Sequence, residues 1–147
     1  MKWFSVLVLG MGLLMAASAS AAENEADAVL GEWYTDEDKS IVEIYRLDDK
    51  FYGKIAWLRE PCRSDGSERR DIHNPDESRR NGGIIGLQLL SDFQYSGRNR
   101  WDKGTIYDPN NGKTYSCKMS LKGDRLKIRG YVGIAAFGKT IIWRRKE

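Results

Sequence analysis

The sequence predicts an all-β fold: an eight-stranded antiparallel meander that closes into a small barrel, with one long loop that carries a short helix. Two observations predict this fold. Apolar and polar residues alternate along most of the chain, and short segments rich in Asp, Asn, Gly and Pro separate the alternating runs. Alternation is typical of strands with one buried and one exposed face, which form antiparallel sheets. Short turns place successive strands side by side, and closure into a barrel removes the unpaired edges.

The clearest strands lie near the C-terminus, at residues 113–122 and 125–132. In the first, every second residue from Tyr115 to Leu121 is apolar or carries a thiol, and the residues between them are Ser and Lys. Six further segments show strand patterns and complete the set: 31–35, 41–47, 51–58, 87–93, 99–107 and 139–145. Turn-forming residues connect several of these strands, at 48–49, 108–112 and 122–124.

One segment, residues 59–84, breaks the alternation because it is long, charged and rich in Arg, Asp and Gly. Within it, Asn74 is a suitable N-cap, Pro75 suits a first helical turn, and Glu77 follows three residues after the cap. Two glycines, Gly82 and Gly83, would end this helix after two turns at most. Loops of such length commonly serve a function.

The N-terminal residues 1–22 have the features of a secretory signal peptide. Lys2 precedes an apolar run over residues 6–17, and Ala19 and Ala21 form a small-residue cleavage pattern. The run is shorter than the ~20 residues of a membrane-spanning helix, and no later segment is long and apolar enough to span. We therefore expect an exported protein, located in the periplasm or, alternatively, secreted. Residues 23–147 are then long enough for a single domain.

The segment GIAAFGKT, residues 133–140, matches the phosphate-loop pattern G-x-x-x-x-G-K-T. A phosphate loop requires a following helix, whereas the residues after Lys139 are β-branched and aromatic. We interpret the segment as a hairpin connection with Gly133 and Gly138 at turn positions, so no nucleotide is expected. Nucleic acid is not expected either, because the 24 Lys and Arg nearly balance the 21 Asp and Glu and form no dense stripe.

Two cysteines, Cys62 and Cys117, are present. A pair of cysteines in an exported chain favours a disulfide, which would stabilise the fold by roughly 4 kcal/mol. The separation of the two residues in the sequence does not show whether their Cα atoms lie close enough for a disulfide. The sequence therefore leaves two free thiols open as the alternative.

Candidates for catalysis are few. His73 is the one histidine, and with Asp71 and Asp76 nearby it fits a solvated loop better than a metal site, which needs three or four strong ligands. No G-x-S-x-G segment marks a nucleophile. We expect no catalytic residue, no metal and no cofactor, although an enzyme with its site at the barrel mouth stays open as a third hypothesis.

A series of motifs resembles the bacterial domain-of-unknown-function family 2147. They are, in order, GEWYT, IVEIY, FYGKIAWLREP, NPDESRRNGGIIGLQLL, NRWDKGTIYDPNNGKTYSCKM and LKIRGYVGIAAFGKTIIWRR. The resemblance covers residues 23–147 nearly end to end and implies an exported bacterial protein of unknown activity. It supplies no catalytic residues.

A second resemblance concerns architecture. The segment from Gly31 to Trp33 resembles the G-x-W motif of lipocalin-like (calycin) barrels, in which the Trp packs under an Arg from the closing strand. We match that Arg to Arg144. A guanidinium stacked on an indole would contribute ~0.5–2 kcal/mol to barrel closure.

An eight-stranded barrel is just wide enough for packed side chains or for one small ligand. The predicted inward-facing residues that would contact a ligand are Phe51, Ile55, Trp57, Tyr115, Met119 and Ile128. Such aromatic and sulfur-containing side chains suit a small apolar or amphipathic molecule. The alternative is a filled core in an envelope interaction or structural module that acts through its surface or through residues 59–84. The sequence identifies no protein partner.

Overall fold

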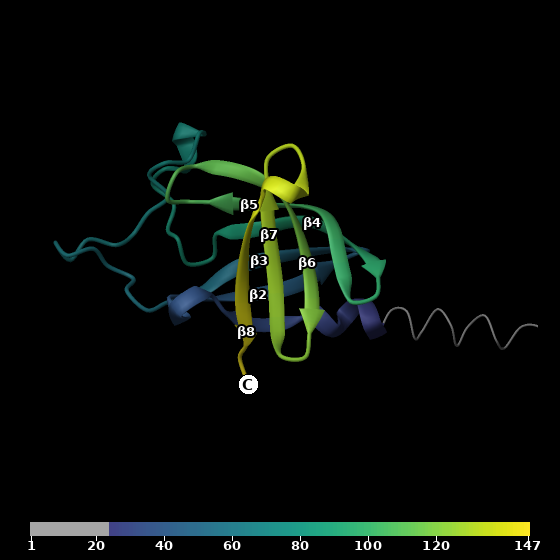
Figure 1. Cartoon of the computed structure of the whole chain (residues 1–147). Helices are drawn as coiled ribbons and strands as arrows, with labels where there is room; N and C mark the ends of the chain where they lie inside the picture. Colours follow the sequence, from purple (N-terminus) through teal and green to yellow (C-terminus); the bar gives the residue numbers. More distant parts are fainter. Residues whose placement is uncertain (1–23) are drawn as a thin grey trace, which may run out of the picture.

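The computed structural model describes residues 24–147 of the chain. The predicted signal peptide, residues 1–22, lies outside the described residues. Eight strands form one closed antiparallel barrel in which each strand pairs with its neighbours in sequence (Figure 1). The strands are β1 (Gly31–Tyr34), β2 (Ser40–Leu47), β3 (Lys50–Leu58), β4 (Gln88–Gly97), β5 (Arg100–Asp108), β6 (Lys113–Lys122), β7 (Arg125–Tyr131) and β8 (Lys139–Arg145). The predicted meander and its closure are confirmed.

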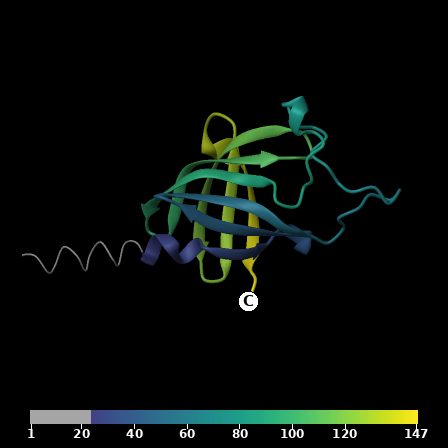
Figure 2. The ribbon, with the colours of Figure 1, turned by 180° about the vertical axis from the view of Figure 1, so that it is seen from behind.

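Closure occurs where β1 pairs with β8, and Trp33 lies opposite Arg145 in this short ladder. Because the strands form an antiparallel meander, successive connections lie alternately at the two ends of the barrel. One end, which we call the open end, contains connections 35–39, 59–87, 109–112 and 132–138. The other end, which we call the closed end, contains connections 48–49, 98–99 and 123–124. The long loop and the N-terminal helical segment therefore extend from opposite ends (Figures 1 and 2).

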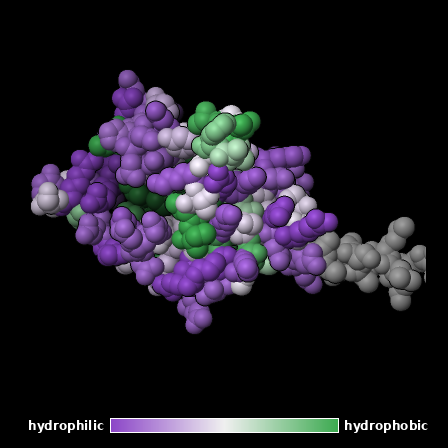
Figure 3. Space-filling model, viewed as in Figure 1, coloured by the Kyte–Doolittle hydropathy of each residue, from purple (hydrophilic) through white to green (hydrophobic). Residues whose placement is uncertain are grey.

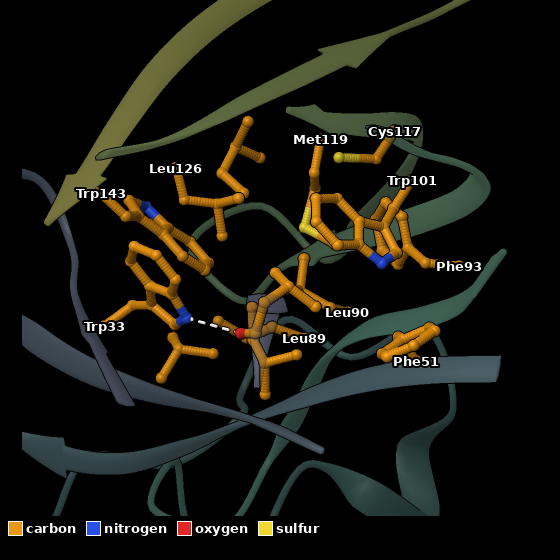
Figure 4. Close-up of a cluster of buried hydrophobic side chains, with 14 of the residues drawn as sticks. Trp33, Phe51, Leu89, Leu90, Phe93, Trp101, Cys117, Met119, Leu126 and Trp143 are labelled. Carbon is orange, nitrogen blue, oxygen red and sulfur yellow. Dashed lines mark hydrogen bonds between the residues drawn. The ribbon is translucent and has the colours of Figure 1, made fainter. Parts of the chain in front are cut away.

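A short helical segment, residues 24–29, plugs the closed end and includes the 3₁₀ turn η1 (Asp27–Val29). Its carbonyl oxygens accept hydrogen bonds from the barrel wall. Trp33 Nε1 donates to the Val29 oxygen at 2.9 Å (dashed line in Figure 4), and Trp101 Nε1 donates to the Ala26 oxygen at 3.1 Å. We call residues 24–29 the plug. Its buried carbonyl oxygens at Ala26 and Val29 thus have hydrogen-bond donors, as buried backbone groups require.

The arginine that seals this end is Arg145, so the prediction of Arg144 is wrong by one residue. The Arg145 guanidinium lies 4.2 Å from the centre of the Trp33 ring. It also donates to the Leu30 oxygen at 3.1 Å and to the Ala28 oxygen at 2.6 Å. Side chains alternate along a strand, so Arg145 shares the inner face with Trp143 while Arg144 points outward over Tyr34.

The closed half of the barrel is filled by large side chains. Trp101 packs edge-on against Phe51 (Figure 4). Tyr95 tilts against the same indole. Further buried side chains complete this core: Trp33, Leu90, Phe93, Cys117, Met119, Leu126 and Trp143. Glycines inside the wall give them room, because a Cβ on Gly104 would lie 2.5 Å from atoms of the Phe93 ring.

The segment 133–140 is a hairpin connection between β7 and β8, as predicted. It contains the 3₁₀ turn η4 (Ala135–Phe137), and β8 begins at Lys139 without an intervening α-helix. Gly133 has a φ of 76°, in the left-handed region that favours glycine. The Arg129 guanidinium holds the turn by donating to the Ala135 oxygen at 2.6 Å.

The long connection carries the short helix that the sequence predicts, as the single 3₁₀ turn η3 (Glu77–Arg79). Its N-cap differs from the prediction. Asp76 caps the turn by accepting from the backbone N–H of Ser78, and Asn74 instead accepts from the N–H of Asp76. The Asn74 side chain forms an Asx turn, which moves the helix start by two residues.

Candidate ligand-binding cavity

A cavity of about 1690 Å³ spans the open end of the barrel, from strand residues inside the wall outward between the loops, including residues 59–73 of the long loop. Figure 3 shows apolar side chains at the bottom of a hollow that is bordered by hydrophilic ones. A smaller depression of about 400 Å³ lies over β4–β7 and is lined largely by charged and hydroxyl side chains. Only the first combines depth, an apolar wall and an entrance.

Apolar side chains on the strands line the inner part of the cavity: Ile55, Leu89, Ile106, Ile128, Ile141 and Trp143. The last of these is also part of the filled half, so Trp143 lies at the boundary between core and cavity. Its Nε1 is buried and has no hydrogen-bond partner among residues 24–147. The indoles of Trp33 and Trp101, by contrast, both donate to the plug.

The six residues predicted to contact a ligand separate into three groups. Ile55, Tyr115 and Ile128 line the cavity. Phe51 and Met119 face inward but belong to the filled half, where they are buried.

The prediction for the sixth residue, Trp57, is wrong. This residue is 42% exposed and does not line the cavity. The register between β2 and β3 shifts after the Val42–Ile55 pair, so that Ile41 lies opposite Trp57. The extra residue, Ala56, forms a bulge that reverses the facing of the following side chains. Leu58 therefore turns inward to the cavity wall in place of Trp57.

Sequence reasoning missed Ile106, Ile141 and above all Gly130 as cavity residues. The signal was present for Gly130, because alternation along β7 places it on the inner face with Leu126 and Ile128. A Cβ at Gly130 would lie 3.4 Å from Ile106 Cγ2, which is an ordinary contact distance. A small side chain would therefore fit at this position in ordinary contact with Ile106 and Tyr115.

A family model described as "uncharacterized protein conserved in bacteria" (DUF2147) matches residues 31–145. The chain belongs to this family. No curated protein matches the chain. A solved structure from the human pathogen Helicobacter pylori, described as belonging to the lipocalin family, is similar to it with 28% sequence identity and a TM-score of 0.70. The similarity covers 81% of this chain and 83% of the other, which supports the lipocalin-like barrel.

In this member of the DUF2147 family, a buried carboxylate fixes the long loop over the open end. Asp71 is 1% exposed. The Tyr107 hydroxyl of β5 donates to its Oδ1 at 2.6 Å, and the Asn74 amide donates to its Oδ2 at 2.8 Å. Burial, and then the hydrogen bond to Asp71, raise the pKa of Tyr107 to about 12. The loop also packs closely on the β5–β6 turn, where a side chain at Gly112 would collide with the His73 carbonyl oxygen.

Tyr107→Phe is expected to lower the free energy of unfolding by about 1.5–3 kcal/mol, because the variant leaves Oδ1 of the buried Asp71 without its hydrogen-bond donor. Because the raised pKa favours the neutral hydroxyl, its stabilisation is complete below pH ~10 and is lost as pH rises through about 12. Urea unfolding of wild type and variant at pH 7 and between pH 10 and 12 checks both statements. Tyr131→Phe is the control, since no hydrogen bond of its hydroxyl is present in the described chain. Equal stabilities of Tyr107→Phe and wild type at pH 7 would contradict the anchoring role.

Both cysteines are free thiols, so the predicted disulfide is not present in the structure. Cys117 is buried in the middle of β6, and burial raises the pKa of its thiol to about 12. Cys62 lies exposed in the long loop, where its backbone pairs with that of Glu68 in an isolated antiparallel β-bridge. One thiol thus faces the core and the other lies beyond the barrel mouth.

Residues 24–147 contain no group of three His, Cys, Asp or Glu side chains that could hold a metal ion. His73 is exposed and lies at the edge of the cavity. Across the same described residues, no helix has the length and apolarity to cross a bilayer.

Proposed function

We propose that this protein is an exported, non-catalytic barrel that binds one small apolar or amphipathic molecule in its open half. One observation carries the proposal: large side chains fill the closed half, whereas apolar strand residues of the open half line the inner part of a cavity of about 1690 Å³ that extends outward between the loops. Small-molecule sites are typically concave, mostly apolar and formed before binding.

The division of the barrel argues against a core that is filled throughout. Gly104 gives space to the Phe93 ring, whereas Gly130 has no neighbour closer than 3.4 Å on its inner side. The plug closes one end with hydrogen bonds from Trp33 and Trp101, so a guest has a floor beneath it and one entrance.

An interaction module is a second candidate because of one surface feature. The tip of the β7–β8 connection exposes Val132, Ile134 and Phe137 by 75%, 59% and 83% (Figure 3). Exposed apolar clusters often mark interaction sites. Val132 and Phe137 also line the cavity entrance, so we favour a role for this tip in admitting an apolar guest.

Native mass spectrometry of the protein purified from its own host tests the proposal and is expected to reveal a retained small molecule. The neutral fluorophore N-phenyl-1-naphthylamine, added to the delipidated protein, provides an affinity measurement. Gly130→Leu places a side chain inside the cavity and is expected to weaken binding of the fluorophore about tenfold or more, since ~1.4 kcal/mol of lost contact is tenfold.

Ser116→Leu is the matched control, because Ser116 is exposed on the outer face of the adjacent strand β6. It adds the same bulk without entering the cavity, and affinity is expected to stay within twofold. No retained molecule together with no fluorophore binding would refute the proposal. Equal losses in the two variants would place the fluorophore elsewhere.

A further inference from the structure

The side chains that line the cavity carry an excess of positive charge. One of the 24 Lys and Arg and one of the 21 Asp and Glu precede residue 24, so residues 24–147 keep a net formal charge of +3. The cations that line the cavity are Lys39, Arg59, Arg63, Arg69, Arg70 and Lys139, and the acids are Asp36, Glu60 and Asp108. The entrance therefore has an excess of three cations, and the remaining described surface is balanced.

Four of these cations have no carboxylate partner within 4.0 Å among residues 24–147, whereas Lys39 pairs with Glu37 and Arg69 with Glu60. Arg59 donates to the Glu37 and Asp38 carbonyl oxygens, and Arg70 donates to the Asn81 oxygen at 3.4 Å. These contacts position the guanidinium groups. For Arg63 and Lys139, the described chain offers no side-chain hydrogen-bond partner at all.

The cations stand on two sides of the entrance. Arg63 and Arg70 belong to the long loop after β3, and Lys139 begins β8. The loop itself is fixed through the buried Asp71 and its Tyr107 partner, so its arginines are held over the entrance. Deeper in the cavity, the strand residues that form the wall are apolar, as described above.

From this arrangement we propose that the bound molecule is an anionic amphiphile, with an apolar tail among the isoleucines and a carboxylate or phosphate head at the cationic rim. This inference rests on the proposed function and names the chemical class of its ligand. Guanidinium groups match both carboxylates and phosphates with paired hydrogen bonds. An excess of cations also attracts such molecules to the entrance before they bind.

Isothermal titration of the delipidated protein with four probes of equal tail length tests the inference. The probes are dodecanoate, dodecyl phosphate, dodecanol and dodecyltrimethylammonium, each below its self-association concentration. Both anions are expected to bind about tenfold more tightly than dodecanol, and the ammonium probe more weakly than dodecanol. Comparison of dodecanoate with dodecyl phosphate identifies the preferred head. The preference for anions is expected to decline with added salt, which screens exposed charges.

The double variant Arg63→Gln/Lys139→Gln removes two rim cations whose side chains form no hydrogen bond or ion pair within residues 24–147. We expect it to weaken binding of the anions about tenfold and to leave dodecanol within twofold of wild type. Arg98→Gln/Lys122→Gln is the control, because it removes two exposed cations at the closed end, one in the β4–β5 turn and one at the end of β6. We expect this control to leave all affinities within twofold.

The possible outcomes separate the two proposals. Binding of all probes with equal affinity, or equal weakening of anions and dodecanol in the rim variant, would overturn the anionic class and keep the binding barrel. Absence of binding by all four probes would overturn the binding barrel itself, and the anionic class with it.

Discussion

Arg145→Ala is expected to lower the free energy of unfolding by about 3 kcal/mol. The guanidinium stacks on Trp33 with 4.2 Å between its carbon and the ring centre. It also donates to the Ala28 and Leu30 carbonyl oxygens at 2.6 and 3.1 Å. The substitution removes the stacking and leaves two carbonyls of the N-terminal segment without their donor. Urea unfolding followed by tryptophan fluorescence measures the loss.

Arg144→Ala is the matched control because the two arginines are adjacent on β8 and face opposite sides of the wall. Arg144 lies over the Tyr34 ring at 4.6 Å and pairs with Asp38 at 3.2 Å, with 43% of its own side chain exposed. Exposed pairs of this kind contribute less than about 1 kcal/mol. A larger loss in Arg144→Ala than in Arg145→Ala would contradict the closure described above.

The two arginines illustrate what alternation can and cannot settle. The resemblance to lipocalin-like barrels predicted an arginine of the last strand over Trp33, and the structure contains one. The assignment to Arg144 took the residue next to Trp143, although an inward Trp143 places Arg145, two residues later, on the same face. The correct position could therefore be predicted from the pattern itself.

Trp57 illustrates the opposite case. Phe51, Ile55 and Trp57 lie an even number of residues apart, so a regular strand over residues 51–58 predicts an inward indole. The bulge at Ala56 depends on how β3 pairs with β2. Because this pairing involves residues distant in the sequence, the bulge cannot be predicted from residues 51–58 alone. The anchoring of Asp71 by Tyr107 is equally non-local, since the two residues are 36 positions apart.

Strand positions were predictable because alternation and turn residues are local signals. The volume of the cavity was not, since it depends on which inward positions lack a side chain and on what fills the space opposite. Gly104 and Gly130 both face inward. The first lies against the Phe93 ring and the second borders the cavity. Two inward-facing glycines thus lie in different surroundings, one in the filled half and one at the cavity.

Gly104→Ala is expected to lower the free energy of unfolding by about 3 kcal/mol, at the upper end of overpacking effects. The new Cβ would lie 2.5 Å from Cδ1 and Cδ2 of Phe93, far inside contact distance. The ring is fully buried in a core that also contains Trp101, so it cannot move into solvent. Thermal and urea unfolding measure the effect.

Gly130→Ala is the control and is expected to leave the free energy of unfolding within about 0.5 kcal/mol, or to raise it slightly by restricting the unfolded chain. Its Cβ meets Ile106 at the normal distance of 3.4 Å. If the Gly104 effect arises from the Phe93 ring, Phe93→Leu in the Gly104→Ala background should recover part of the loss. The two substitutions would then be non-additive, as expected for residues in contact. Strict additivity would instead assign the loss to the backbone of β5, and the filled half of the barrel would owe nothing to this glycine.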